Sequence, residues 1–199
     1  MTVLVTGATG FVGYNLVPAL KQQGHDVVCL IRTTSNTRLL DEIGGVRYGN
    51  ASPMRRAKEL PFVRNMAQIG IRDIRTSEDQ VADAEAEGSV IITRDTVRER
   101  GPERAAELLP PLGDVFVTID IDGLDPSIAP GTGSPTADGL LYHEVKSILR
   151  AVARRGNVVG FDLVEVNPMV DDHGRTCLLA NTLILEFLGA IFDRRDPGN

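Results

Sequence analysis

The feature that most constrains the fold is the alternation of short apolar runs with segments of helical spacing. Runs rich in β-branched residues occupy 2–6, 26–32, 67–72, 90–93, 115–120 and 158–163, and helical spacing occupies 11–23, 77–87, 101–109, 142–155 and 175–192. Apolar strands without polar alternation must be covered on both faces, and the intervening helices supply that cover. The sequence therefore predicts an α/β fold: a mainly parallel sheet with helices on both faces, in three layers.

The clearest helical segment is 142–155. Its apolar residues Val145, Ile148, Leu149 and Val152 recur at the spacing of one helix face. We expect this face to lie in the core.

Composition narrows the function classes. Hydrophobic residues make up 42% of the 199 residues and charged residues 24%, as in ordinary globular proteins. The net charge of −6 argues against a nucleic-acid or membrane-surface partner, since both require a basic patch. We find no uninterrupted apolar run of about 18–20 residues and no basic leader, so we expect a cytoplasmic location with Cys29 and Cys177 as reduced thiols.

A glycine-rich turn follows the first apolar run. Gly7, Gly10 and Gly13 stand three residues apart, directly after a strand-like segment and at the start of a helical one. Glycines let backbone N–H groups approach a pyrophosphate, which the helix N-terminus attracts. The pattern predicts a phosphate-binding turn in a Rossmann-like βαβ segment.

Residues 1–48 resemble the start of an extended short-chain dehydrogenase/reductase of the NAD-dependent epimerase/dehydratase type. The resemblance is carried by 3–13 and by Gly24-His25-Asp26-Val27. It implies NAD(P) binding, with Arg32 on the 2′-phosphate of NADP. The alternative is a structural remnant without nucleotide, because a full dinucleotide site draws on more strands than these two.

Two aspartates follow another apolar run, at 115–117. On a strand, residues two apart face the same way, so Asp120 and Asp122 are expected to direct their carboxylates together. The carboxyl ends of parallel strands form the crevice in which α/β sheets bind ligands. Paired oxygen ligands suit Mn²⁺ or Mg²⁺. The alternative is that these acids cap a turn at the surface.

Residues 50–199 resemble the C-terminal half of the ureohydrolases, the arginase/agmatinase family, and agmatinase most of all. The resemblance is carried by 118–126, Ala129-Pro130-Gly131-Thr132-Gly133, 52–57, Gln68-Ile69-Gly70-Ile71-Arg72 and 160–168. It implies that Asp120 and Asp122 are manganese ligands and that Glu165 receives the substrate guanidinium, for which a carboxylate is a bidentate partner. It also implies that Asp162 supports the site, while Asp125 before a proline is expected in a turn.

The family's other metal ligands lie in a Gly-Gly-Asp-His stretch and a His-x-Asp-Ala-His-x-Asp cluster, and neither occurs in this sequence. The histidines present, His25, His143 and His173, stand outside any such motif. We therefore expect a fusion of a reductase-like segment, 1–48, with a ureohydrolase-like half, 49–199, in one combined domain.

Three interpretations remain open. The first is a ureohydrolase that cleaves a guanidino compound such as agmatine to urea and an amine, impaired by an incomplete Mn²⁺ site. The second is an NAD(P)-binding module, and the third is a non-catalytic remnant. The expected partners are a small guanidino substrate and further copies of the chain in a homo-oligomer, with no nucleic acid and no membrane.

Overall fold

The computed structural model describes residues 2–6, 26–30, 53–72 and 78–193. It divides into two compact units, Met1–Arg64 and Asn65–Asn199, and each is described by itself. The predicted phosphate-binding residues, Gly7, Gly10, Gly13 and Arg32, lie outside the described residues, as do 48–52 at the predicted seam. The boundary between 48 and 49 therefore stays a prediction.

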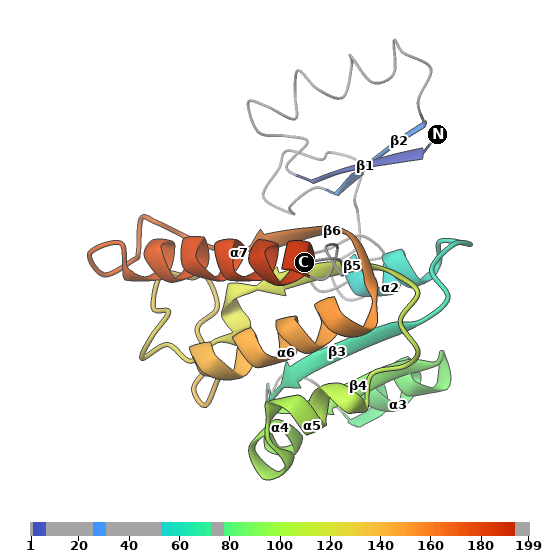
Figure 1. Cartoon of the computed structure of the whole chain (residues 1–199), viewed down its shortest axis with the longest axis horizontal. Coiled ribbons are helices and arrows are strands. Elements are labelled where there is room, and N and C mark those ends of the chain that lie inside the picture. The colour runs from blue at the N-terminus through green and yellow to red at the C-terminus, as the bar shows by residue number, and fades with distance from the viewer. Residues whose placement is uncertain (1, 7–25, 31–52, 73–77, 194–199) are drawn as a thin grey trace. The chain divides into compact units, whose positions relative to one another are not determined.

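The first unit contains a pair of parallel strands (Figure 1). β1 (Thr2–Thr6) pairs with β2 (Asp26–Leu30) over the full length of both strands. A parallel pair is what a βαβ unit requires, and the connecting residues 7–25 are not described. The short helix α2 (Pro53–Lys58) begins with a proline, which suits a first helical turn.

The second unit contains two further parallel pairs. β3 (Met66–Ile71) pairs with β4 (Ser89–Thr93), and β5 (Asp114–Asp120) pairs with β6 (Asn157–Val164). The predicted α/β class with parallel strands is confirmed. The register places Thr118 opposite Asp162 and Asp120 opposite Val164, so the carboxyl ends of β5 and β6 lie together.

Five helices accompany these strands in the described part of the second unit: α3 (Glu78–Ala86), α4 (Arg94–Arg100), α5 (Pro102–Glu107), α6 (Tyr142–Arg155) and α7 (Arg175–Asp193). Helix α4 was not predicted, because its polar sequence lacks apolar spacing. The Thr93 side chain caps it by accepting a hydrogen bond from the Thr96 N–H at 3.1 Å. Gly101, at a φ of 82°, ends α4, and Pro102 begins α5.

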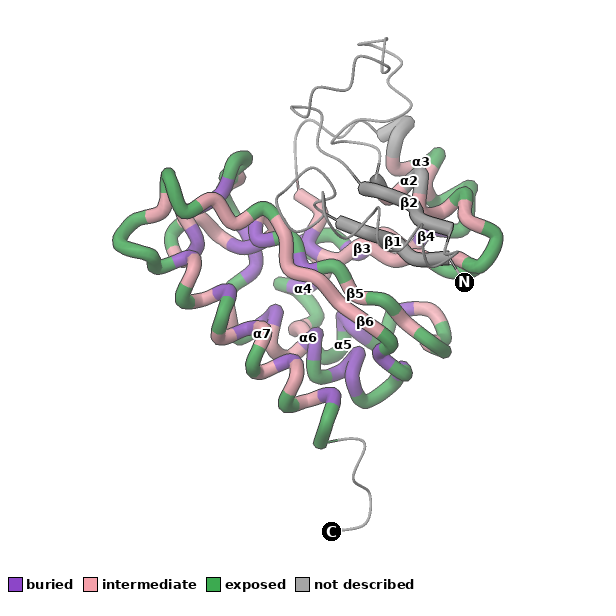
Figure 2. The backbone as a smooth tube through the Cα atoms, turned by 90° about the horizontal axis from the view of Figure 1, so that it is seen from above, coloured by how far each residue is buried: buried purple, intermediate pink, exposed green. Residues whose placement is uncertain are grey.

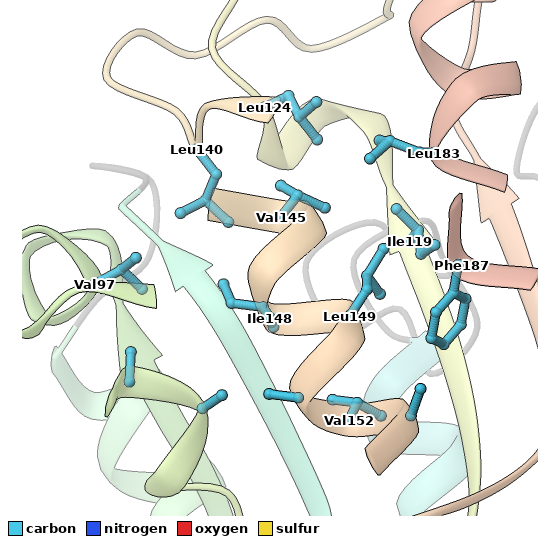
Figure 3. Close-up of a cluster of buried hydrophobic side chains, with 14 of the residues drawn as sticks. Val97, Ile119, Leu124, Leu140, Val145, Ile148, Leu149, Val152, Leu183 and Phe187 are labelled. Atoms are coloured by element: carbon cyan, nitrogen blue, oxygen red, sulfur yellow. The ribbon is translucent and has the colours of Figure 1, made fainter. Parts of the chain in front are cut away.

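Helix α6 lies at the centre of the core (Figure 3). Val145, Ile148, Leu149 and Val152 are all buried, which confirms the face predicted from their spacing. Their neighbours come from β5 and α7 and include Ile119, Leu183 and Phe187. Phe187 meets Phe161 of β6 edge to face, with ring centroids 5.1 Å apart.

The two faces of the β5–β6 pair differ in how far they are buried. Val117, Ile119, Phe161 and Leu163 belong to the core or pack against it. On β5 the residues between them are exposed, and exposed residues are green in Figure 2. Phe116 keeps 54% of its surface accessible. The strand therefore carries a buried face that fixes it and an exposed face that leads to Asp120.

Helix α7 is long and apolar enough, by length and composition alone, to cross a membrane. Over its most apolar 18 residues the mean hydropathy is 1.5, and 28% of this stretch is buried. The helix contributes Ala180, Leu183, Phe187 and Ile191 to the core. One face of the helix therefore lies in the core, while Leu178, Leu185 and Phe192 are exposed.

Candidate functional site

The first acidic pair lies where β5 ends. The strand stops at Asp120, and Ile121–Gly123 form one turn of 3₁₀ helix, so Asp122 stands in a turn and not on a strand. The same-face argument for the two aspartates was therefore wrong. Asp120 Oδ1 accepts a hydrogen bond from the Asp122 N–H at 2.9 Å, so Asp120 also caps the turn, as the alternative interpretation held.

The carboxyl group of Asp120 has an unusual environment. Although the residue exposes much of its surface, partial loss of solvent around the carboxyl raises its pKa to about 6. The hydrogen bond from Asp122 and the charge of Arg72 oppose this rise in pKa, whereas the charges of Asp122 and Glu165 add to it. Asp120, Asp122 and Glu165 are thus close enough for their charges to interact.

A second segment supports the turn that carries these aspartates. The Leu140 N–H donates to the Gly123 carbonyl at 2.9 Å, and the Asp125 N–H donates to the Leu140 carbonyl at 3.0 Å. Asp125 accepts hydrogen bonds from the N–H groups of Ser127 and Gly139, which confirms its predicted turn role. A Cβ at Gly139 would lie 2.3 Å from the Asp125 nitrogen, so only glycine fits this approach.

Arg72 is a site residue for which the sequence suggested no role. It follows β3 directly, and its guanidinium donates three hydrogen bonds to backbone carbonyls. Nη2 reaches Asp122 at 3.0 Å and Thr136 at 2.6 Å, and Nε reaches Ala137 at 3.1 Å. The only signal was its place in the Gln68–Arg72 motif.

Glu165 stands directly after β6 with a φ of 65°, in the left-handed region that a residue with a Cβ seldom adopts. Its carbonyl accepts a hydrogen bond from the buried Thr132 hydroxyl at 3.1 Å. The Asn167 N–H donates to the Gly131 carbonyl at 2.8 Å. The 129–133 motif therefore fixes the backbone around Glu165, which explains how the strained residue is held.

The same motif contacts the start of α7. The Gly131 N–H donates to the buried Thr176 hydroxyl at 2.7 Å. A Cβ at Gly131 would lie 2.5 Å from Asp171, which leaves room only for glycine. Asp171 accepts hydrogen bonds from the N–H groups of Thr176 and Cys177, both at 3.0 Å. Glu165 is thus connected to α7 through this loop.

Asp162 lies on β6 opposite Thr118 and faces the same side of the strand pair as Asp120, since paired residues in a parallel ladder share a face. Its Oδ1 is buried and has no hydrogen-bond partner among the described residues. Its predicted supporting role stays a prediction.

A cavity of about 350 Å³ lies beside Arg72, at the carboxyl ends of β3 and β4. It is lined by Ile71, Arg72, Val81, Thr93, Asp95, Ala137 and Asp138. Asp120, Asp122 and Glu165 do not line it. The carboxylate cluster therefore lies outside this cavity, although Arg72 contacts both the cavity and the Asp122 carbonyl.

The described residues do not complete a manganese site. Asp120 and Asp122 offer oxygen ligands, but no group of three or more His, Cys, Asp or Glu side chains in the described ranges is arranged to hold a metal ion. His143 and His173 are both exposed, and His173 contacts Asp172. Two carboxylates cannot fill the octahedral sites of two manganese ions.

The chain is similar to known proteins over most of its length. A family model described as the arginase family matches residues 4–189. The chain is 38% identical to proclavaminate amidinohydrolase of Streptomyces clavuligerus over 149 residues, 72% of this chain and 47% of that protein. It is 34% identical to an agmatinase of Bacillus subtilis over 185 residues, 92% of this chain and 61% of that protein.

The fold is similar as well. The structure of the agmatine ureohydrolase of Thermoplasma volcanium matches with a TM-score of 0.67 and 25% identity, over 93% of this chain and 69% of that one. The chain spans about half the length of the curated relatives it matches. The family match begins at residue 4 and so includes the segment that resembles a reductase, and the comparisons give no support to nucleotide binding there.

Proposed function

Because the chain belongs to the arginase family, we propose that its carboxylate cluster binds a guanidino compound, with agmatine as the first candidate. The observation that supports this most is the meeting of Asp120, Asp122 and Glu165 at the carboxyl ends of neighbouring parallel strands. Each side chain comes from a motif shared with the family. A planar guanidinium pairs with carboxylate oxygens through two parallel hydrogen bonds, so an acidic cluster suits it.

Hydrolysis of that compound is proposed to be slow or absent in this chain alone. The family resemblance implies Mn²⁺, which would supply a hydroxide for attack on the guanidino carbon. Asp120 and Asp122 are the described residues that match metal-binding positions, and no third ligand accompanies them in the described ranges. Binding of the substrate without an activated hydroxide gives no turnover.

Calorimetry with agmatine, together with urea release at saturating Mn²⁺, tests both parts. We expect agmatine to bind the full chain, Glu165→Gln to weaken that binding, and urea release to stay at background. The matched control is Asp114→Asn, because Asp114 lies at the opposite end of β5, where its carboxylate accepts a hydrogen bond from Asn157.

Two outcomes would overturn these proposals. Equal agmatine binding by the wild type and Glu165→Gln would exclude the carboxylate cluster as the binding site. Manganese-dependent urea release that Asp120→Asn abolishes would show that further residues complete the metal site, and the slow-hydrolysis proposal would be wrong.

The nucleotide-binding alternative rests on the glycine pattern and on the parallel pairing of β1 with β2. If Gly7, Gly10, Gly13 and Arg32 form a working site, NADPH should bind with a dissociation constant in the low-micromolar range. Gly10→Val should then abolish that binding, because the side chain of the introduced valine would block the approach of the phosphates. Weak binding that is unchanged in the variant would leave the structural remnant as the better account. Self-association and a cytoplasmic location also stay predictions.

A further inference from the structure

One arginine joins three parts of the second unit that are far apart in the sequence. The Arg72 guanidinium binds the carbonyls of Asp122, Thr136 and Ala137, which lie 50, 64 and 65 residues further along the chain. These bonds connect the end of β3, the turn after β5 and the 133–139 loop. A planar guanidinium carries donors in a fixed fork, so it can hold several carbonyls in one arrangement.

The bonds from Arg72 complement those that other residues make. Gly123 and Asp125 are held by Gly139 and Leu140 through backbone and carboxylate hydrogen bonds. Arg72 binds the adjacent carbonyl, that of Asp122 itself. Arg72 thus bonds directly to the backbone of the acidic turn from outside the 120–140 segment.

We propose that Arg72 is a positioning residue, which fixes the backbone of Asp122 against the 133–139 loop and so sets the direction of the Asp120 and Asp122 carboxylates. Its consequence for ligand binding rests on the proposed function, whereas its effect on the turn does not. The proposed role is mechanical, through the carbonyls.

An electrostatic role of Arg72 would change agmatine binding in the opposite direction to the mechanical role. The positive charge of Arg72 acts on Asp120 and would repel a cationic ligand. If only the charge of Arg72 mattered, Arg72→Gln would strengthen agmatine binding because it removes the charge. Arg72→Lys would leave the binding unchanged because it keeps the charge. If position matters, both Arg72→Gln and Arg72→Lys weaken binding, because neither side chain spans the three carbonyls as the guanidinium does.

Arg98 offers a matched control. It also reaches the 133–139 loop, through a salt bridge to Asp138, and it also contacts Asp95 of its own helix. Both contacts are exposed, and neither involves the turn after β5. Arg98→Lys therefore perturbs an arginine that contacts the same loop, without removing the bond from Arg72 to Asp122.

Hydrogen exchange on the full chain is the first measurement. In Arg72→Lys and Arg72→Gln we expect the amides of Asp125 and Leu140 to exchange about tenfold faster, while amides of α6 keep their rates. Arg98→Lys should leave all of them unchanged. Unchanged exchange in both Arg72 variants, or equal acceleration across α6, would overturn the proposal, since the latter would make Arg72 a general stability contact.

Calorimetry with agmatine is the second measurement. We expect the dissociation constant to rise about tenfold in both Arg72 variants, in the range found when residues that orient a site's ligands are replaced. Tighter binding by Arg72→Gln with no change in Arg72→Lys would overturn the mechanical role. If the wild type does not bind agmatine, the proposed function fails, and the exchange rates alone decide on Arg72.

Discussion

The two strand pairs of the second unit carry opposite chemistry at their carboxyl ends. Beyond β5 and β6 stand the acids Asp120, Asp122 and Glu165, whereas β3 is followed by Arg72. At the acidic end the charges of the three carboxylates act on one another. At the β3 end the guanidinium is used on backbone carbonyls. The end for which we propose ligand binding and the end that supports it thus both follow a pair of parallel strands.

The supporting core is also uneven. The β5–β6 pair lies against α6 and α7 through large side chains such as Leu149, Leu183 and Phe187. The β3–β4 pair packs against the core with fewer fully buried side chains. Ile92 is buried, whereas Ala67, Ile69 and Val90 are only partly buried. We therefore expect the acidic end to depend most on the packing of α7.

Phe187→Ala should destabilise the fold that supports the acidic end more than any other variant proposed below. Phe187 is 1% exposed and packs against Phe161 of β6, so its loss leaves a cavity worth about 3–5 kcal/mol of unfolding free energy. Urea unfolding measures this loss. Phe192→Ala on the same helix, at a residue 59% exposed, should change the unfolding free energy by less than about 0.5 kcal/mol. Similar losses in both variants would mean that the burial pattern of α7 is wrong.

Glu144→Ala tests the connection between the two strand pairs. Arg94, which follows β4, forms a buried ion pair with Glu144 of α6 at 3.0 Å and donates to the Gly139 carbonyl. Removing the carboxylate leaves a buried charge without its partner, and we expect a loss of about 3 kcal/mol in chemical unfolding. Glu186→Ala, which breaks more exposed ion pairs to Lys146 and Arg150, should cost clearly less. The reverse order would contradict the buried connection.

Thr132→Val sharpens the comparison at Glu165. The change keeps the shape of a buried side chain and removes the hydroxyl that donates to the Glu165 carbonyl, so we expect a loss of about 1 kcal/mol in unfolding free energy. Agmatine binding should weaken as well, because Glu165 is no longer held. Thr136→Val is the control, because the half-buried Thr136 hydroxyl makes an exposed hydrogen bond to the Ser134 carbonyl. Unchanged binding in Thr132→Val would show that Glu165 is held by other contacts.

Asp171→Asn gives the smallest expected effect and a pH signature. Partial burial opposes the shift, but hydrogen bonds from Thr176 and Cys177 outweigh it and lower the pKa of Asp171 to about 2. A lowered pKa contributes stability above the ordinary value of 3.8, and this contribution is lost as the pH falls through about 2. The variant should melt slightly below the wild type at pH 7, and the two melting temperatures should converge near pH 2. A difference that persists at pH 2 would contradict the role of the carboxylate charge.

Much of the fold could be predicted where the signal is local. Helix α6 was predicted with its exact bounds, since four apolar residues at helical spacing mark one buried face. Strands β3 to β6 were predicted to within a residue or two at each end. Helix α4 was missed because its stability comes from a Thr93 cap and buried contacts of Arg94 and Val97, which leave no repeating apolar pattern.

The sequence by itself determined which residues stand at the carboxyl ends of β5 and β6. Each apolar run predicts a strand, and the acids that follow the runs, Asp120 and Glu165, are then placed at the strand ends. It also determined the membership of the chain in its family through the motifs around Thr118, Ala129 and Gly160. Only the tertiary structure decided that Asp122 sits in a turn, that Thr132 holds a left-handed Glu165, and that Arg72 binds the Asp122 carbonyl. The physical reason for the last two is their range along the chain. Periodicity records which face of a segment meets the core, whereas these two contacts join residues 33 and 50 positions apart, which lie together only once the core has packed.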